Sequence, residues 1–133
     1  KLFNASTGWI NTTAMYQVNA TNLTIVNDGT TTINLTFSVN QSISSWFGGT
    51  GGDARVKFID LETSSCTGTI PGNYTRQLNT TSQAVCTSGT LGQGLSYADA
   101  QDTIAAFVNL LIPRNLFTGQ HTTTITFTAV SND

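Results

Sequence analysis

The chain has 133 residues, five Lys or Arg, seven Asp or Glu and a formal net charge of −2. This length suits one domain with a single core, and five scattered cations are too few for the basic stripe that nucleic-acid binding requires. The sequence has no apolar run of about 18 residues, so we expect no membrane span. No basic and apolar leader precedes Lys1, and we expect the chain to be a mature, processed form.

Small polar residues dominate the composition. The chain contains 25 Thr, 11 Ser and 12 Asn, whereas charged residues make up only 9% of it. Thr favours strands, and Asn and Ser favour turns. Hydrophobic residues are 38% of the chain, which is enough for a core. A surface with so little charge needs another source of solvation.

Apolar and polar residues alternate with a period of two through most of the chain. The alternation predicts strands over residues 3–10, 14–20, 22–26, 31–39, 43–47, 55–61 and 122–130, with shorter strands near 76–78 and 83–86. Residues 103–112 are compatible with strand or helix, and their β-branched side chains favour a central strand. An S-x-x-D motif that begins at Ser96 predicts one or two turns of helix. The predicted fold class is therefore all-β, a β-sandwich of the Ig-like or jelly-roll type.

Eight of the 12 asparagines begin an N-x-Ser/Thr sequon, the acceptor of N-linked glycans in exported proteins. The eight are Asn4, Asn11, Asn19, Asn22, Asn34, Asn40, Asn73 and Asn79. Thr-rich strands also produce sequons by chance, but chance alone gives about three here. On the predicted strands, Asn19, Asn22 and Asn34 have the solvent-facing parity that a glycan needs. We therefore expect covalent N-linked glycans and no cofactor.

Cys66 and Cys86 are the only cysteines. An even number of cysteines in an exported chain predicts one disulfide, and two buried free thiols are the alternative. We expect no metal site, because the chain has no C-x-x-C pair and His121 is its only histidine.

No candidate catalytic residues emerge, and we expect no enzyme activity. The glycine cluster at residues 48–52 lacks the Lys-Ser/Thr of a phosphate-binding loop. Two carboxylate pairs, Asp60 with Glu62 and Asp99 with Asp102, are typical of a solvated strand end and a capped turn. Trp9 and Trp46 could form a sugar-binding platform, but aromatic residues more often belong to a core.

The first predicted strand places Phe3, Ala5, Thr7 and Trp9 on one face. Such a strand needs an apolar groove to fill. It could be the first strand of its own sandwich, or it could be a donor strand that completes the sandwich of a neighbouring copy. A groove left open in the monomer would expose backbone polar groups and apolar side chains and would drive such pairing.

Two stretches and the dense sequons resemble secreted, fibre-forming β-sandwich subunits of the archaeal thread and bundling-pilus type, and more distantly the TasA-type matrix fibres. The stretches are VNDGTTTINLTFSV, residues 26–39, and IPRNLFTGQHTTTITFTAV, residues 112–130. The resemblance implies that residues 1–11 are an N-terminal donor strand and that residues 12–133 form one sandwich domain. The donor residues would be Leu2, Phe3, Ala5, Thr7, Trp9 and Ile10.

The same resemblance implies a head-to-tail homopolymer, an extracellular filament that serves adhesion or biofilm cohesion and contacts the cell surface or matrix. The chain has more sequons than chaperone–usher pilins and lacks the hydrophobic N-terminal helix of type IV pilins. Two other functions remain open: a monomeric carbohydrate-binding or adhesin domain that uses Trp46 and the glycine cluster, and a surface-layer module.

Overall fold

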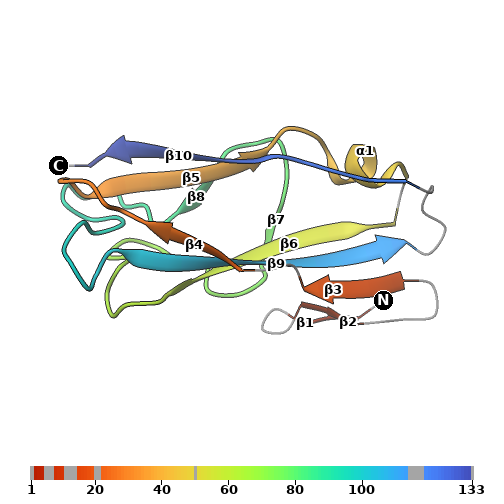
Figure 1. Ribbon diagram of the computed structural model, residues 1–133, viewed down its shortest axis with the longest axis horizontal. Coiled ribbons are helices and arrows are strands. Elements are labelled where there is room, and N and C mark those ends of the chain that lie inside the picture. Colours follow the sequence, from red (N-terminus) through yellow and green to blue (C-terminus); the bar gives the residue numbers. More distant parts are fainter. Residues whose placement is uncertain are drawn as a thin grey trace.

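The computed structural model describes residues 2–4, 8–10, 15–19, 22–49, 51–113 and 119–132, and for the first three of these ranges it describes the backbone. These residues form strands and one short helix (Figure 1). The elements are β1 (Leu2–Asn4), β2 (Gly8–Ile10), β3 (Met15–Asn19), β4 (Leu23–Val26), β5 (Ile33–Val39), α1 (Ile43–Phe47), β6 (Asp53–Asp60), β7 (Arg76–Gln77), β8 (Gln83–Val85), β9 (Thr103–Pro113) and β10 (Ile125–Ser131).

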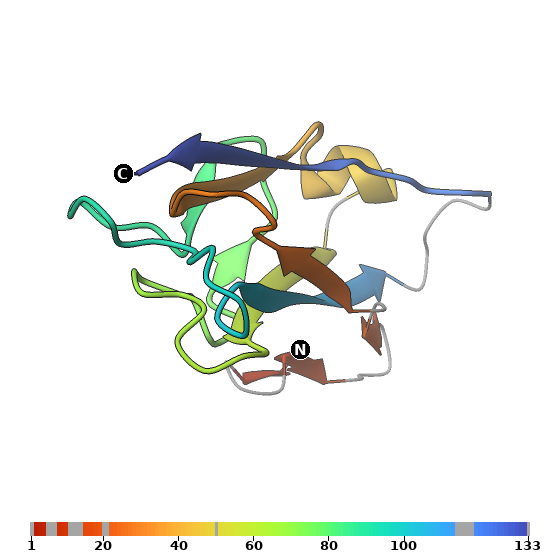
Figure 2. The ribbon, with the colours of Figure 1, turned by 60° about the vertical axis from the view of Figure 1, so that its left-hand side comes forward.

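Two antiparallel sheets pack face to face as a sandwich (Figures 1 and 2). The larger sheet has the order β3-β9-β6-β7. β6 pairs along one edge of β9, and β3 and β4 follow one another along its other edge. The smaller sheet has the order β10-β5-β8. The predicted β-sandwich is therefore confirmed, and residues 103–112 belong to a central strand.

The core lies where the inward faces of the two sheets meet, and the predicted parity is confirmed in the central strands. Leu35, Phe37 and Val39 of β5 are buried, as are Val56 and Phe58 of β6. The ring centroids of Phe37 and Phe58 lie 5.3 Å apart, and Phe127 of β10 lies 6.4 Å from each. Aromatic contacts across the interior therefore join both sheets.

Residues 43–47 were expected to be a strand, and this prediction is wrong, because they form the helix α1. Ser42 caps the helix: its Oγ accepts a hydrogen bond from Ser45 N at 3.2 Å. Gly48 ends the helix with a φ of 72°, which glycine adopts without strain. A serine cap and a glycine stop thus decide the structure of a segment too short for a clear apolar period.

Two further predictions need correction. The expected helix at Ser96 is a hydrogen-bonded turn, in which Gln101 N donates to Ala98 O at 2.9 Å. Residues 3–10, expected to be one strand, form the two short strands β1 and β2, which pair antiparallel with Phe3 opposite Trp9. The residues between the apolar ends of this segment are Asn, Ala, Ser, Thr and Gly, a composition that favours chain reversal.

The β1–β2 hairpin lies on the outer face of the larger sheet, away from the smaller sheet (Figures 1 and 2). β2 contacts β9 and β3. The described strands of the N-terminal segment are therefore outside the interior of the sandwich.

The predicted disulfide between Cys66 and Cys86 is present, with the two Cα atoms 5.2 Å apart. It joins the loop that follows β6 to the end of β8, and so connects segments of the two sheets. A disulfide that persists indicates an oxidising compartment.

Replacing both cysteines by Ala should lower the free energy of unfolding by about 3 kcal/mol, because the bridge closes a loop with a sequence separation of 20 residues. Urea denaturation measures the change. Reduction of the unmodified protein is the control and should produce a loss of similar size. A loss well below about 1 kcal/mol in both samples would contradict the stabilising role.

Tyr74 is buried on the outer face of the larger sheet, where Lys57 Nζ lies 4.8 Å from the centroid of its ring. Burial raises the pKa of Tyr74 above the ordinary value of 10.0, because the phenolate loses solvation. The folded state thus favours the neutral phenol. Its contribution to stability is present below about pH 10 and is lost as the pH rises through the raised pKa.

The variant Tyr74→Phe keeps the Asn73 sequon and should show a weaker decline of the unfolding free energy above about pH 10 than the unmodified protein. Urea denaturation between pH 8 and pH 11 measures this decline. The matched control is Tyr97→Phe, which removes an exposed phenol. Identical alkaline profiles for Tyr74→Phe and the unmodified protein would contradict the prediction.

Candidate functional site

The two long sides of the sandwich differ in whether the chain closes the gap between the sheets. On one side the chain crosses directly between the sheets after β7: Leu78 N donates to Ala54 O of the larger sheet, and Val39 N of the smaller sheet donates to Asn79 O, both at 2.9 Å. Two adjacent residues thus hold the sheets together there. The opposite side lies between β10 and β4, and none of the described strands closes it.

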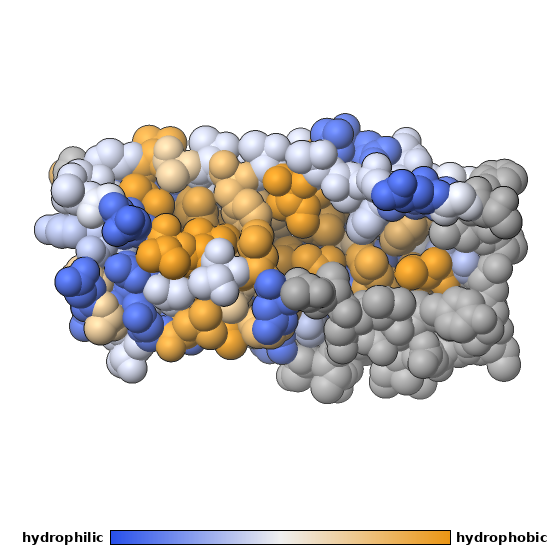
Figure 3. All heavy atoms as spheres, in the orientation of Figure 1, coloured by the Kyte–Doolittle hydropathy of each residue, from blue (hydrophilic) through white to orange (hydrophobic). Residues whose placement is uncertain are grey.

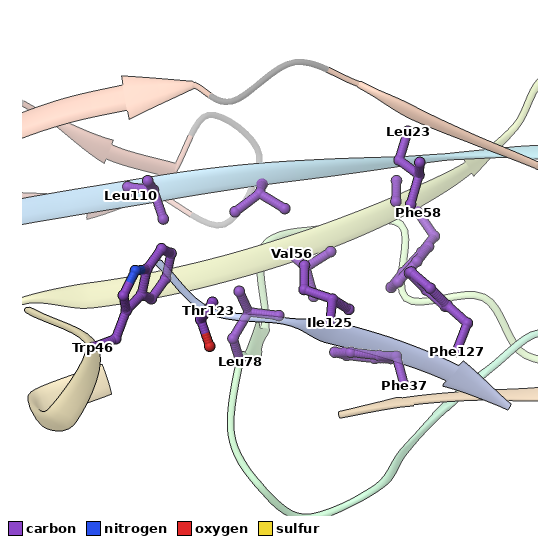
Figure 4. A pocket seen from close by; sticks show the side chains of 12 residues that line it. Leu23, Phe37, Trp46, Val56, Phe58, Leu78, Leu110, Thr123, Ile125 and Phe127 are labelled. Atoms are coloured by element: carbon purple, nitrogen blue, oxygen red, sulfur yellow. The ribbon is translucent and has the colours of Figure 1, made fainter. Parts of the chain in front are cut away.

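An apolar groove of about 270 Å³ lies between the sheets and reaches this open side (Figure 4). Figure 3 shows apolar side chains gathered along the opening between β10 and β4. Its lining residues come from both sheets and from α1, and none of them is charged: Leu23, Phe37, Trp46, Val56, Phe58, Leu78, Ala106, Val108, Leu110, Thr123, Ile125 and Phe127.

Burial falls sharply from the floor of the groove to its rim. Phe37 and Phe58, on the floor, are 1% and 0% exposed. Leu23, on β4 at the rim, is 48% exposed, and Ile125 and Phe127 of β10 are half-buried. The rim therefore presents apolar surface that a further strand could cover.

The edge of β10 beside the groove also offers backbone hydrogen bonds. Asn40 N donates to Thr124 O at 3.3 Å, and Asn132 N donates to Thr32 O at 2.9 Å. Because bonding alternates along an antiparallel pair, the even-numbered residues of β10 bond to β5. The N–H and C=O groups of Ile125, Phe127, Ala129 and Ser131 then point to the other edge, where none of the described strands pairs with β10.

Trp46 lies at one end of the groove, where α1 places it. Its ring stacks on Phe47 with centroids 4.7 Å apart, and its backbone oxygen accepts a hydrogen bond from His121 Nδ1 at 2.9 Å. Its indole Nε1 is buried without a hydrogen-bond partner in the described part of the chain. This atom is a polar group that an occupant of the groove could satisfy.

The glycine cluster lines a different and more polar hollow of about 400 Å³, with Gly49, Gly51 and Gly52 beside Ser42 and Gln77. Trp46 does not line this hollow. The structure thus separates the two features that the carbohydrate-binding alternative combined.

The described sequon asparagines lie on or near the surface. Asn22, Asn40 and Asn73 are exposed, and Asn34 and Asn79 are half-buried. The side chains of Asn4, Asn11 and Asn19 lie outside the described residues.

Three sequon asparagines use their side-chain oxygen as an acceptor. Asn79 Oδ1 accepts from Thr81 N at 2.9 Å, Asn40 Oδ1 from Thr124 N at 3.2 Å, and Asn34 Oδ1 from Ser88 N at 3.3 Å. Glycans attach to the nitrogen of this amide, which takes no part in these bonds. The arrangement orients each amide and is compatible with glycosylation at its nitrogen.

Three of the four carboxylates in the two predicted pairs accept hydrogen bonds from backbone or side-chain donors of the fold. Asp60 Oδ1 accepts from Cys66 N, and Glu62 Oε2 accepts from Asp102 N. Asp102 Oδ1 in turn accepts from Thr103 Oγ1. Within the described ranges, no group of three His, Cys, Asp or Glu side chains could hold a metal ion.

Of the predicted donor residues, Leu2, Phe3, Trp9 and Ile10 lie in β1 and β2, where the backbone is described. Ala5 and Thr7 lie outside the described residues. An open groove was expected as part of the donor-strand alternative, but its position and its lining residues were not predicted. β10 gives only a partial signal, because the alternation of Ile125 and Phe127 with Thr indicates a strand with one buried face and does not identify an edge.

Comparisons with protein-family models, curated proteins and solved structures find no match to this chain.

Of the described helical residues, none belongs to a helix long and apolar enough to cross a membrane.

If the groove is apolar and open, a charge on its rim should reduce the binding of a hydrophobic dye. Ile125→Asp places a carboxylate in the groove, whereas the matched control Thr126→Asp places it on the exposed face of the same strand. We expect dye fluorescence of folded Ile125→Asp to fall by at least about half, since a charge disfavours apolar contact, and that of Thr126→Asp to stay unchanged. Circular dichroism checks folding. Equal fluorescence of the two folded variants would contradict an open groove.

Proposed function

We propose that this protein is a structural subunit of an extracellular, N-glycosylated filament, in which residues 2–10 of one copy fill the groove of the next. The observation that carries the proposal is the apolar groove along the edge of β10 that no described strand covers. Such a surface takes an added strand through backbone hydrogen bonds and alternating side chains.

Once β1 and β2 separate and the segment extends, residues 2–10 match the groove in length, charge and period. It has nine residues, which is enough to run past the seven residues of β10. Neither the segment nor the groove lining contains a charged residue. Phe3, Ala5, Thr7 and Trp9 share one parity, and a strand paired with β10 would direct every second side chain into the groove.

Such a strand would make a durable link. Full burial of a large apolar side chain such as Phe3 stabilises by roughly 1.5–3 kcal/mol. Each backbone hydrogen bond adds about 0.5–1.5 kcal/mol, and four residues of β10 offer both their N–H and C=O groups. Together, apolar burial and backbone hydrogen bonds support a contact that persists without a covalent bond.

The proposed glycans and the disulfide are both consistent with an extracellular filament. Glycans on the exposed Asn22, Asn40 and Asn73 would solvate a surface that has few charges, and the disulfide indicates an oxidising compartment. Extracellular adhesion or biofilm cohesion then becomes a property of the filament, and the single subunit performs no chemistry.

The carbohydrate-binding alternative has less support. A sugar-binding platform presents an aromatic face to solvent, whereas Trp46 is half-buried, stacks on Phe47 and lines the groove between the sheets.

A charge substitution in the full-length chain tests the proposed role of the N-terminal segment. Thr7→Asp has the groove-facing parity and should reduce filament yield at least about tenfold, because it would bury an unpaired carboxylate. The neighbouring Gly8→Asp has the opposite parity and should assemble normally. Both variants keep the Asn4 sequon. Electron microscopy and sedimentation measure the yield, and equal assembly of the two variants would contradict the proposal.

A further inference from the structure

We infer that the donor strand runs parallel to β10, so that subunits join end to end in one orientation. The inference rests on the proposed function and specifies its partner: the N-terminal segment of a second copy, in one of two possible directions. It follows from the directions of the described strands.

The groove has two distinct ends. At the first, which we call the α1 end, lie Trp46, Leu110 and Thr123; at the second, the far end, lie Leu23 and Phe127 (Figure 4). β10 therefore begins at the α1 end and runs beyond the far end to Ser131.

β3 and β4 run in the same direction as β10. Val18 of β3 is paired with Leu110 at the α1 end, and Leu23 of β4 is paired with Ala106 at the far end. The chain thus enters the sandwich at the α1 end, where Met15 is paired with Pro113.

A donor strand antiparallel to β10 would finish at the α1 end. Met15 of the same chain begins there, and only residues 11–14 separate it from Ile10. The segment could then close its own groove as a hairpin, at an effective concentration far above that of any second copy. Two copies could equally exchange their segments and close as a pair. Neither arrangement extends a filament.

A donor strand parallel to β10 would finish at the far end, and there the same chain cannot be its source. From the level of Ala106, which is paired with Leu23 at the far end, back to Met15, beside Pro113, is about 23 Å along β9 at ~3.3 Å per residue. The five steps from Ile10 to Met15 span at most about 18 Å. A parallel donor must therefore come from another copy.

The parallel direction also defines how copies join. The far end of the acceptor would meet the α1 end of the donor, where the donor's β3 begins. The donor keeps its own groove open, and the same contact repeats without closing. The directions of the described strands therefore favour the parallel donor for filament growth.

Crosslinking in the full-length chain determines the direction independently of the register. Leu2→Cys and Gly8→Cys have the solvent-facing parity of the donor, and neither removes a sequon. Each is combined in turn with Cys at Thr124, which directly precedes β10, or at Thr126, Thr128 or Val130 of β10; all four positions are exposed. Both native cysteines form the disulfide, so the introduced thiols react with each other.

Filaments are oxidised, and covalent multimers are measured on denaturing gels without reductant. For a parallel donor, the best partner of Leu2→Cys should precede that of Gly8→Cys along β10, with yields about tenfold above those of positions four residues away. The reverse order would overturn the inferred direction and leave the donor role intact. Filaments that form without any crosslink, or crosslinks within single chains alone, would overturn the donor role itself.

Discussion

The central constraint on this structure is a sheet edge that borders a core covered on one side only. A strand edge that lacks a partner leaves N–H and C=O groups to water, and an open side between two sheets leaves apolar side chains exposed. The crossing at Leu78 and Asn79 covers one long side of the sandwich, and no strand in the described part of the chain covers the other side along β10. The stable core and the exposed rim thus belong to the same side-chain layer.

The sequence predicts where the strands lie better than it predicts which strands lie side by side. Period-two alternation identifies the inward residues of β5 and β6, because burial on one face imposes that period directly. It fails for residues 43–47, where a serine cap and a glycine stop outweigh a short pattern. It cannot identify the groove, because the exposure of Leu23 and Phe127 depends on which strands lie side by side, and local pattern carries no such information.

The chemistry of the surface bears on the proposed assembly of the protein. Because the chain has few charges, the solvation of its outer faces depends on Thr, Ser and Asn side chains, and on glycans where the sequons are occupied. Many charged proteins protect an edge strand by placing Lys upon it, but β10 has no charged residue. An edge without such protection would be a liability in a monomer, whereas in the proposed filament it would be the surface that joins one copy to the next.

Hydrogen exchange at the amides of β10 tests this account most directly. In the monomer, Thr126 and Thr128 should be protected by β5, whereas Phe127 and Ala129 should exchange rapidly. In filaments, the exchange of Phe127 and Ala129 should slow at least about a hundredfold, because an added strand accepts their N–H groups. Filaments in which Phe127 and Ala129 exchange as fast as in the monomer would contradict strand addition at β10.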